Sequence, residues 1–314
     1  MARFLVTGGA GFIGSHIVEA LVERGDQVRV IDNLSTGNVE NLRPWMDEIE
    51  FIEGDLLDRP TVDRAVSGVD YVFHEAALAS VPRSVERPLE THAHCVTATL
   101  TLLDAARRSG VKRLVYAASS SAYGDQPFAS KREIDLPVPI SPYGVAKYAG
   151  ECYCRSFTAT YGFETVCLRY FNVFGPRQDP DSPYSAVIPL FVTAMLAGEP
   201  PTVHGDGLQS RDFTFVGNVV HGNLLAAKAK GVAGRVFNVA MGGSITLLKL
   251  IAILNELLGT DIQPNHGAPR QGDIRESMAD ITEARRLLGF EPIVDFEEGL
   301  RRSIEYYQAL ATRR

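Results

Sequence analysis

The sequence predicts a protein of the α/β class, in which a doubly wound parallel sheet carries a smaller, interleaved domain. Two observations predict this fold. Short apolar runs alternate with helical stretches over the first half of the chain, which is typical of parallel strands joined by helices. Several of these runs are almost entirely apolar, such as residues 28–31 and 114–117, which indicates strands that helices cover on both faces.

The strands of this sheet are expected in two parts of the chain. Six lie at residues 3–7, 27–31, 49–53, 71–74, 113–118 and 165–171, and a later one at 235–240 returns to the sheet. Residues 176–212 are rich in Pro, Gly and Asp, with one predicted helix at 188–197. We therefore expect one domain over residues 1–175 and a substrate domain over 176–314, with about 213–250 returning to the first.

Charge and composition exclude several classes of protein. The 314 residues include 31 Lys and Arg and 38 Asp and Glu, which gives a net charge of −7, and these charges are scattered. We expect neither a nucleic-acid nor a membrane partner. Cys95, Cys152, Cys154 and Cys167 lack the spacing of a disulfide framework or metal site, and the first residues enter a strand directly. Reduced thiols, no metal and a cytoplasmic location are expected.

A glycine-rich turn follows the first strand. Residues 7–14 read TGGAGFIG and precede a helical stretch. Gly8 permits a tight turn, Gly11 lets the backbone approach a pyrophosphate, and Gly14 allows close helix packing, while the helix amino terminus faces the phosphates. Asp32 ends the second strand, where a carboxylate can accept ribose hydroxyls and would repel a 2′-phosphate. A Rossmann-type site for NAD rather than NADP is predicted.

Further polar residues follow other strands of the predicted sheet. Asp55 offers a contact to adenine at the carboxyl edge, where open parallel sheets bind ligands. His74 and Glu75 also end a strand, but a histidine in that place is commonly just hydrogen-bonded. Neither is assigned a catalytic role.

The predicted chemistry depends on Tyr143 and Lys147, which lie four residues apart on one face of a helix that opens at Ser141. A phenol with a pKa near ~10 is a poor base, but an adjacent ammonium and a cationic nicotinamide both stabilise phenolate. Tyr143 can then take a proton from a sugar hydroxyl. Ser119, at the end of the fifth strand, can hydrogen-bond the same hydroxyl.

Several motifs, in order along nearly the whole chain, resemble those of one family. They read VTGGAGFIGSH, DNLSTG, VYAASSSAYGD, SPYGVAKYAGE, LRYFNVFGPRQ, GDGLQSRDF and RQGDIRESMAD. The chain resembles the UDP-hexose 4-epimerases of the extended short-chain dehydrogenase type, and most of all their UDP-N-acetylglucosamine 4-epimerase branch. The resemblance implies reversible C4 epimerisation of UDP-N-acetylglucosamine and UDP-N-acetylgalactosamine, with UDP-glucose and UDP-galactose alongside. It also implies a homodimer that pairs helices at 97–107 and 143–160.

The resemblance implies roles for individual positions. The catalytic residues would be Ser119, Tyr143 and Lys147. NAD would be bound by these three and by Gly8, Gly11, Phe12, Ile13, Gly14, Asp32, Asn33, Ser35, Thr36, Gly37, Asp55, Leu56, Ala76, Ala77, Tyr170 and Phe171. The UDP-sugar would contact Ser80, Ser119, Ser121, Tyr143, Asn172, Val187, Arg211, Arg270, Asp273 and Ser277.

Some of these assignments leave alternatives open. Arg211 and Arg270 would suit bidentate contacts to a diphosphate, or they form exposed salt bridges. Ser277 would widen the pocket beside the sugar C2, where some members carry tyrosine, or it is a surface serine near a turn. Cys95 replaces the asparagine usual in the family, so another polar group or water contacts NAD instead, or NAD is held less tightly.

The same fold also carries functions other than epimerisation. A 4,6-dehydratase needs an Asp-Glu pair just after the fifth strand, where this chain has Ser120 and Ser121. The related decarboxylases carry glutamate at the position of Ser121. A non-catalytic NAD-binding regulator need not keep Ser119, Tyr143 and Lys147 together.

Overall fold

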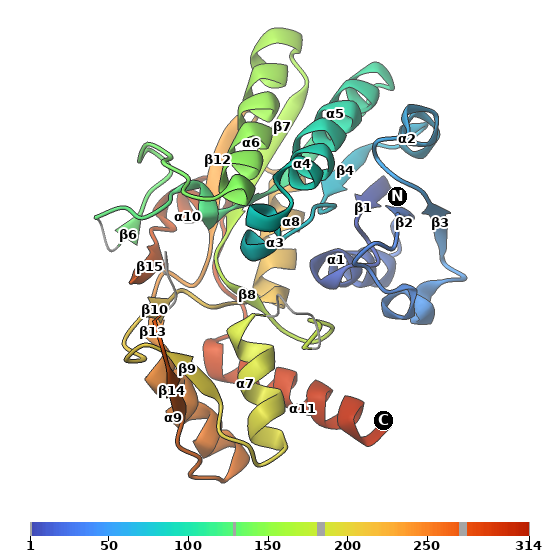
Figure 1. Ribbon diagram of the computed structural model, residues 1–314. Helices are drawn as coiled ribbons and strands as arrows, with labels where there is room; N and C mark the ends of the chain where they lie inside the picture. The colour runs from blue at the N-terminus through green and yellow to red at the C-terminus, as the bar shows by residue number, and fades with distance from the viewer. Residues whose placement is uncertain (1, 128–129, 181–185, 270–274, 314) are drawn as a thin grey trace.

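The computed structural model describes residues 2–127, 130–180, 186–269 and 275–313. Its centre is a parallel sheet, shown in Figure 1, that has seven strands within the described residues. In spatial order these are β12 (Arg235–Val239), β7 (Glu164–Tyr170), β5 (Arg113–Ser119), β4 (Tyr71–His74), β1 (Arg3–Thr7), β2 (Gln27–Asp32) and β3 (Ile49–Glu53). The strand order reverses beside β1, so the crevice at its carboxyl end is where such sheets bind ligands.

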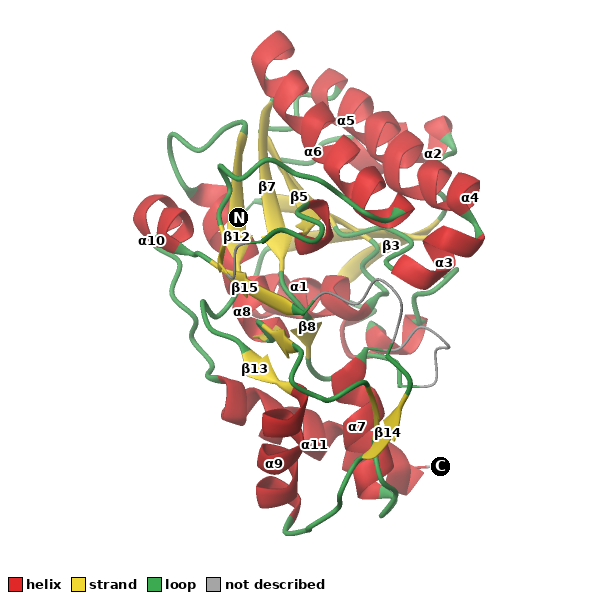
Figure 2. Ribbon diagram, turned by 60° about the vertical axis from the view of Figure 1, so that its left-hand side comes forward, coloured by secondary structure: helices red, strands yellow, loops and turns green. Residues whose placement is uncertain are grey.

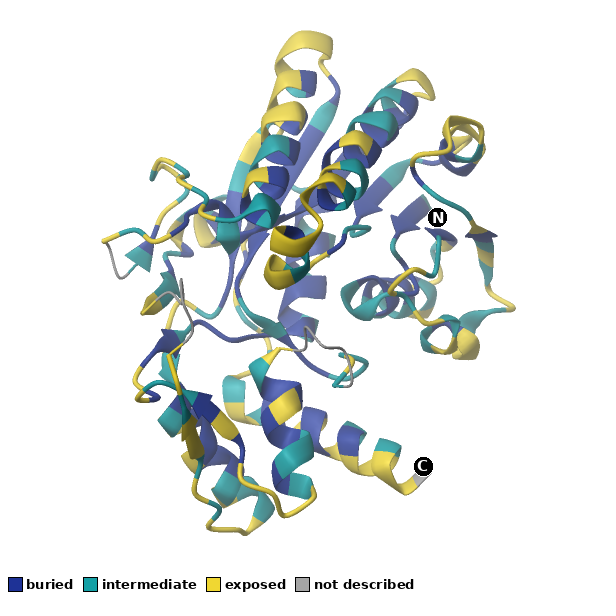
Figure 3. Ribbon diagram, viewed as in Figure 1, coloured by how far each residue is buried: buried dark blue, intermediate teal, exposed yellow. Residues whose placement is uncertain are grey.

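Helices cover both faces of this sheet (Figures 1 and 3). One face packs against α1 (Phe12–Glu23), α8 (Val216–Lys228) and α10 (Thr282–Leu288). The other face packs against α2 (Arg59–Val66), α5 (Ala98–Arg108) and α6 (Pro142–Tyr161). All seven residues of β5 are buried, as expected for a strand covered on both sides.

A second lobe lies below the carboxyl edge of the sheet in Figures 1 and 2. Its helices share one hydrophobic core, and they are α7 (Val187–Leu196), α9 (Leu247–Leu258) and α11 (Phe296–Arg313). Between lobe and sheet lie short strands in the order β13 (Ile245–Thr246), β10 (Ser210–Arg211), β15 (Glu276–Ala279) and β6 (Ser130–Lys131). Two further pairs join β11 (Thr214–Phe215) to β8 (Val173–Phe174) and β14 (Asn265–Gly267) to β9 (Thr202–His204).

Short helical elements complete the first lobe. A helical run crosses one face as α4 (Pro88–His92), a π-helical turn η3 (Ala93–Thr97) and α5. The remaining elements are α3 (Val81–Glu86) and the 3₁₀ turns η1 (Val39–Asn41), η2 (Arg43–Trp45) and η4 (Ser120–Ala122). The π-helical turn adds a residue to the helical run at Cys95, and such turns are frequent at functional sites.

The α/β prediction is confirmed, and each predicted strand of the central sheet ends within one residue of the observed one. The strand expected at 235–240 is β12, which pairs with β7.

No helix in the described ranges is long and apolar enough to cross a membrane, and those ranges hold no cluster of potential metal ligands. Cys152 is exposed and Cys154 is buried, and all four cysteines are free thiols. The domain division near residue 175 stays a prediction.

Candidate active site

Two glycines of the glycine-rich turn have no room for a side chain. Gly8 has φ +67°, and a Cβ added to it would lie 2.7 Å from the backbone nitrogen of Ala76. A Cβ on Gly14 would lie 2.1 Å from the Gly8 carbonyl oxygen. Glycine is therefore required at both positions, the first also for its left-handed backbone.

The amino terminus of α1 is open to an anion. Gly11 is the N-cap, and within the described residues no side chain caps the helix and its first turn has no acidic residue. The first N–H groups of a helix, here those of Phe12 and Ile13, have no carbonyl partner within the helix. A diphosphate fits this position, because these N–H groups and the helix dipole both favour negative charge.

Asp32 organises the loop beside this turn. Its carboxylate accepts hydrogen bonds from Ala10 N at 3.0 Å and from Leu34 N at 2.9 Å. A Cβ on Gly37 would lie 3.0 Å from both carboxylate oxygens. Burial raises the pKa of Asp32 although both N–H groups oppose it. The carboxylate thus stands where a ribose would lie after the turn, while the predicted contacts Ser35 and Thr36 are exposed.

Asp55 follows β3, the strand beside β2 at the edge of the sheet. It accepts from Asn33 Nδ2 at 2.8 Å and from Leu57 N at 2.8 Å. His94 Nδ1, from η3, lies 3.9 Å from the second carboxylate oxygen. Leu56 is buried. The structure thus brings Asn33 and Asp55 together at the edge predicted for adenine.

His74 belongs to a buried chain of hydrogen bonds. Ala76 N donates to Thr7 Oγ1 at 3.3 Å, and Thr7 Oγ1 lies 2.8 Å from His74 Nδ1. Nε2 lies 2.9 Å from Thr99 Oγ1, whose hydroxyl donates to the Cys95 carbonyl. Because that hydroxyl is already a donor, Nε2 must carry the imidazole hydrogen. Burial, followed by Lys147, lowers the pKa of His74 to about 3, so His74 is a neutral structural residue.

The three predicted catalytic residues converge at the end of β5. Ser141 Oγ accepts from Gly144 N at 3.1 Å and caps α6, which fixes the helix that carries Tyr143. The Ser119 side chain hydrogen-bonds the Tyr143 hydroxyl, which lowers the pKa of Tyr143, and Ser119 Oγ accepts from Ser121 N at 3.1 Å. Ser119 can therefore donate to a phenolate at this position.

Lys147 lies one turn after Tyr143. Its Nζ donates to the Ala117 carbonyl at 2.8 Å and lies 5.1 Å from the centre of the Tyr116 ring. Burial lowers the pKa of Lys147, whereas nearby acidic groups, among them Glu75 and Glu151, oppose that shift. Burial also raises the pKa of Tyr143 above 10, despite Ser119. Phenolate therefore needs further positive charge beside it, which an oxidised nicotinamide supplies when bound.

Cys95 and Phe171 lie in apolar surroundings. Cys95 is 1% exposed, packs with Leu78 and Ala146, and burial raises its thiol pKa, so the thiol stays neutral. Its Sγ lies 4.0 Å from the Leu78 carbonyl. Phe171 is fully buried, with its ring 6.0 Å from that of Tyr123. Tyr170, which is also predicted to contact NAD, differs from Phe171 in having a polar partner. Its hydroxyl donates to Glu75 Oε1 at 2.9 Å.

Three predicted substrate residues meet around Asp212. Asn172, with φ +32°, donates from Nδ2 to the Asp212 carbonyl at 3.3 Å. Arg211 and Ser277 are register partners in β10 and β15, and Asp212 N donates to the Ser277 carbonyl at 2.8 Å. The Arg211 side chain donates from Nη1 to the Ser210 carbonyl at 2.8 Å.

Asp212 itself was missed by reasoning from sequence. Its carboxylate accepts from the N–H groups of Met241 at 2.9 Å, Gly242 at 3.0 Å and Ala279 at 3.2 Å. Burial raises the pKa of Asp212 to about 6, against these hydrogen bonds. Its position in the GDGLQSRDF motif was the only signal, and nothing in that motif alone distinguishes a structural aspartate from a substrate contact.

The remaining predicted substrate residues that the structure describes belong to three different elements. Ser80 caps α3 by accepting from Arg83 N at 3.2 Å. Ser121 lies in η4 beside Ser119, and Val187 is the first residue of α7. Arg270 and Asp273 lie outside the described residues.

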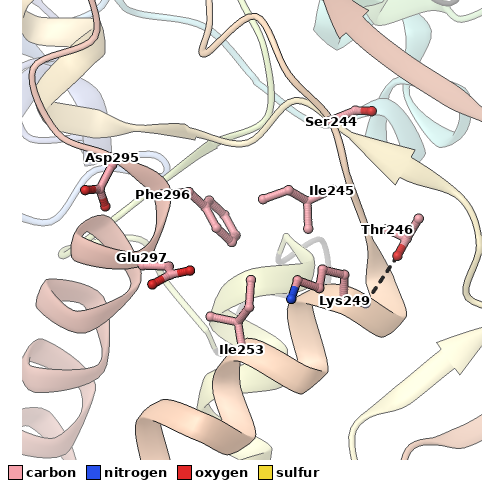
Figure 4. Close-up of a pocket in the computed structure, with 8 residues that line it drawn as sticks. All are labelled: Ser244, Ile245, Thr246, Lys249, Ile253, Asp295, Phe296 and Glu297. Atoms are coloured by element: carbon pink, nitrogen blue, oxygen red, sulfur yellow. Dashed lines mark hydrogen bonds between the residues drawn. The ribbon is translucent and has the colours of Figure 1, made fainter.

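A cavity of about 780 Å³ lies elsewhere, between the starts of α9 and α11. Figure 4 shows Ile245, Phe296 and Ile253 facing its interior, with Lys249 and Glu297 at its side. None of the predicted site residues lines it. The crevice at the sheet edge, and not this cavity, therefore carries the candidate chemistry.

Comparison with known proteins agrees with this geometry. Residues 4–240 match the model of the NAD dependent epimerase/dehydratase family. UDP-glucose 4-epimerase of Mycolicibacterium smegmatis is 37% identical over 311 residues, 98% of each chain.

Two solved structures have the same fold over almost the entire chain. UDP-N-acetylglucosamine 4-epimerase from Methanobrevibacter ruminantium M1, in complex with UDP-N-acetylmuramic acid, is 43% identical, with a TM-score of 0.94 over 98% of this chain and 99% of that one. A dTDP-glucose 4,6-dehydratase from Streptomyces venezuelae with NAD bound is 33% identical, with a TM-score of 0.91 over 99% and 98%. The chain belongs to the NAD-dependent epimerase/dehydratase family, and NAD is its cofactor.

Proposed function

We propose that this chain catalyses the reversible C4 epimerisation of UDP-hexoses. Its substrates are UDP-N-acetylglucosamine and UDP-N-acetylgalactosamine, with UDP-glucose and UDP-galactose alongside. One observation carries the proposal: Ser119 hydrogen-bonds Tyr143, and Lys147 lies one turn further along α6, at the same sheet edge as the glycine-rich turn. The relatives that are 4-epimerases support the reaction type.

Each of the three residues has one role in the proposed reaction. NAD, held at the glycine-rich turn and Asp32, would supply reversible hydride transfer at C4 of the sugar. Tyr143 takes the proton from the O4 hydroxyl and later gives it back. Ser119 hydrogen-bonds both Tyr143 and O4, donating its single hydroxyl hydrogen to one of them and accepting from the other, and the Lys147 ammonium stabilises the phenolate.

The UDP part would stay fixed while the 4-keto sugar turns over in its pocket. We assign this anchoring to Asn172 and Arg211, together with Arg270 and Asp273. Both arginines suit bidentate binding of a diphosphate. If the sugar rotates while UDP stays bound, either face of C4 can be turned toward the cofactor, and the sugar need not leave the site.

Dehydration and decarboxylation are the alternatives within this family. Elimination of water needs carboxyl groups as acid and base beside C5 and C6. Ser120 and Ser121 occupy η4 directly after β5, and neither side chain can supply them. This difference favours epimerisation, although a dehydratase has nearly the same fold.

A homodimer is part of the proposal. Exposed apolar residues lie on α3, α4 and α6, where Val85 is 65%, Leu89 85% and Val145 52% exposed. The proposed dimer pairs α5 and α6 with their copies about a two-fold axis, and α3 and α4 pack against α6, so that the pairing would cover these residues. Light scattering at micromolar concentration should give twice the mass of one chain, and a monomer would contradict the pairing.

The proposed reaction can be tested with a panel of nucleotide sugars. The purified protein is incubated separately with UDP-N-acetylglucosamine, UDP-glucose and UDP-glucuronic acid, and products are identified by nuclear magnetic resonance. We expect the C4 epimers of the first two, without accumulation of free NADH. A 4-keto-6-deoxy sugar would identify a dehydratase, and a UDP-pentose a decarboxylase.

A further inference from the structure

Glu75 is a partly buried carboxyl group that the proposed reaction leaves unused. It directly follows β4, and its N–H donates to the Thr7 carbonyl at 3.2 Å. A Cβ on Gly8 would lie 3.1 Å from the Glu75 carbonyl carbon. Glu75 therefore lies against the glycine-rich turn, at the same edge of the sheet as Ser119.

The Glu75 side chain is fixed by residues from two other elements. Tyr170, at the end of β7, donates to Oε1 at 2.9 Å, and Asn223 of α8 donates to the Tyr170 hydroxyl oxygen at 2.7 Å. Tyr170 is 7% exposed and Asn223 is fully buried. Because Asn223 donates to Tyr170, the Tyr170 hydrogen is directed to Glu75, which favours an acceptor there.

Lys147 of α6 reaches the neighbouring strand end. Glu75 follows His74, the register partner of Tyr116, and Lys147 Nζ donates to the carbonyl of Ala117, the next residue of β5, at 2.8 Å. Burial raises the pKa of Tyr143 and lowers that of Lys147, and an ionised Glu75 adds to the first shift and opposes the second. A negative charge favours the protonated form of each neighbour, which is the phenol in one case and the ammonium in the other. Burial raises the pKa of Glu75 to about 7, against the Tyr170 hydrogen bond and Lys147. The charge on Glu75 therefore changes near neutral pH.

Other titratable groups face this cluster from the surrounding elements. Described residues that act electrostatically on Glu75, Tyr143 or Lys147 include Tyr170 from β7, Cys95 from η3, and Cys154 and Glu151 from α6. His74 is neutral, and Cys95 and Tyr170 have raised pKa values, so they stay uncharged near neutral pH. Glu151 is already paired with Arg169 at 2.7 Å. Glu75 is thus the carboxyl group whose charge can change beside the two catalytic residues.

We propose that Glu75 is a positioning residue whose carboxylate sets the pH range in which Tyr143 transfers its proton and the Lys147 ammonium stabilises the phenolate. This inference rests on the proposed function, in which Tyr143 is the base. Loss of the negative charge favours the phenolate and the neutral amine at lower pH. The pKa values of Tyr143 and Lys147 should then both fall, and the pH range of activity should shift to lower pH at both of its limits.

Two substitutions separate the charge of Glu75 from its packing. Glu75→Gln keeps the length and an oxygen that can accept from Tyr170, but it removes the charge. Glu75→Asp keeps the charge, but it is one methylene shorter and weakens the contact with Tyr170. A purely structural role would make Glu75→Asp the more disturbed variant, whereas a role of the charge singles out Glu75→Gln.

The primary readout needs no sugar. Ultraviolet absorbance of phenolate is titrated from about pH 5 to about pH 10 in the NAD-loaded protein, with the matching Tyr143→Phe variant subtracted to isolate Tyr143. We expect the midpoint of Glu75→Gln to lie at lower pH than that of the wild type, and the midpoint of Glu75→Asp to stay with the wild type. Because no substrate is present, this result stands apart from whether the chain epimerises UDP-sugars.

The second readout is the pH dependence of kcat/KM on the best substrate of the panel. Both limbs of the Glu75→Gln profile should move to lower pH, because the pKa values of Tyr143 and Lys147 both fall. An unchanged phenolate midpoint in Glu75→Gln would overturn the proposal. So would an equal displacement in Glu75→Asp, which would assign the effect to packing against Tyr170.

Discussion

The two sides of the crevice are built in different ways. On the cofactor side, the polar groups stand at the ends of long strands. One of them, β5, has seven residues, all of them buried. On the substrate side, β10, β8 and β11 have two residues each, and the Asp212 carboxylate joins segments that are distant in sequence.

This difference indicates which kind of substitution should disturb each side of the crevice. The predicted cofactor site depends on backbone shape, because Gly8 and Gly14 leave no room for a side chain. The proposed substrate site is held by a few hydrogen bonds, because its short strands contribute little pairing of their own. The proposed catalytic residues lie between the two sites, on α6 and at the end of β5. The following predictions test this contrast, from the largest expected effect to the smallest.

Tyr143→Phe should remove most activity. It deletes one hydroxyl from a proton-transfer group, and such groups contribute ~10²–10⁴-fold to the rate. Initial rates with a UDP-sugar measure the loss, and circular dichroism checks the fold. Tyr148→Phe is the matched control one turn along the same helix and should retain normal rates. Near-normal rates in Tyr143→Phe would reject it as the base.

Asp212→Ala should destabilise the substrate side. It leaves the N–H groups of Met241, Gly242 and Ala279 without their acceptor, which should cost about 3 kcal/mol of unfolding free energy. Urea unfolding measures this loss. Asp206→Ala breaks an exposed ion pair with Arg275 and an exposed hydrogen bond from Leu208 N, and it should change the stability little. Equal stability of the two variants would contradict the role of Asp212.

His74→Gln should reduce the acid sensitivity of the cofactor side. The pKa of His74 is lowered from 6.5 to about 3 in the fold, so its contribution to stability is present above about pH 6.5 and is lost as pH falls toward 3. One proton taken up on unfolding gives a slope of about 1.4 kcal/mol per pH unit. Urea unfolding across this range should show a shallower slope in His74→Gln. Parallel slopes would mean that other groups dominate.

Gly14→Ala should weaken retention of NAD, because its Cβ would meet the Gly8 carbonyl oxygen at 2.1 Å and displace the turn. We expect at least about a tenfold increase in the dissociation constant, equivalent to about 1.4 kcal/mol. Calorimetry with NAD measures it. Gly243→Ala is the control, since a Cβ there meets no described atom within 4 Å. Unchanged affinity in Gly14→Ala would show that the turn tolerates a side chain.

Ser277→Tyr should change specificity with the smallest effect on the fold. Ser277 is partly buried in β15 beside Arg211, and a bulky ring there would narrow the space proposed for the acetamido group. One such contact is typically worth about 10–200-fold in discrimination. We expect UDP-N-acetylglucosamine turnover to fall while UDP-glucose turnover stays. Ser277→Ala should keep both, and equal loss on both sugars in Ser277→Tyr would reject the pocket-wall role.

The sequence by itself determined the sheet, the glycine-rich turn and the order of the proposed catalytic residues. Apolar runs of four to seven residues mark the strands of the sheet, and Gly8 and Asp32 lie at the ends of the first two strands. The spacing of Tyr143 and Lys147 is local to one helix, so it could be predicted without knowledge of the fold.

Only the tertiary structure decided what the isolated polar residues do. Glu75 meets Tyr170 from 95 positions away, and Asp212 meets Ala279 from 67 positions away. Strands of two residues leave no periodic pattern in a sequence, which is why β10 and β8 could not be predicted. Burial and long-range hydrogen bonds, which set the charge state of both carboxyl groups, arise only when these segments pack together.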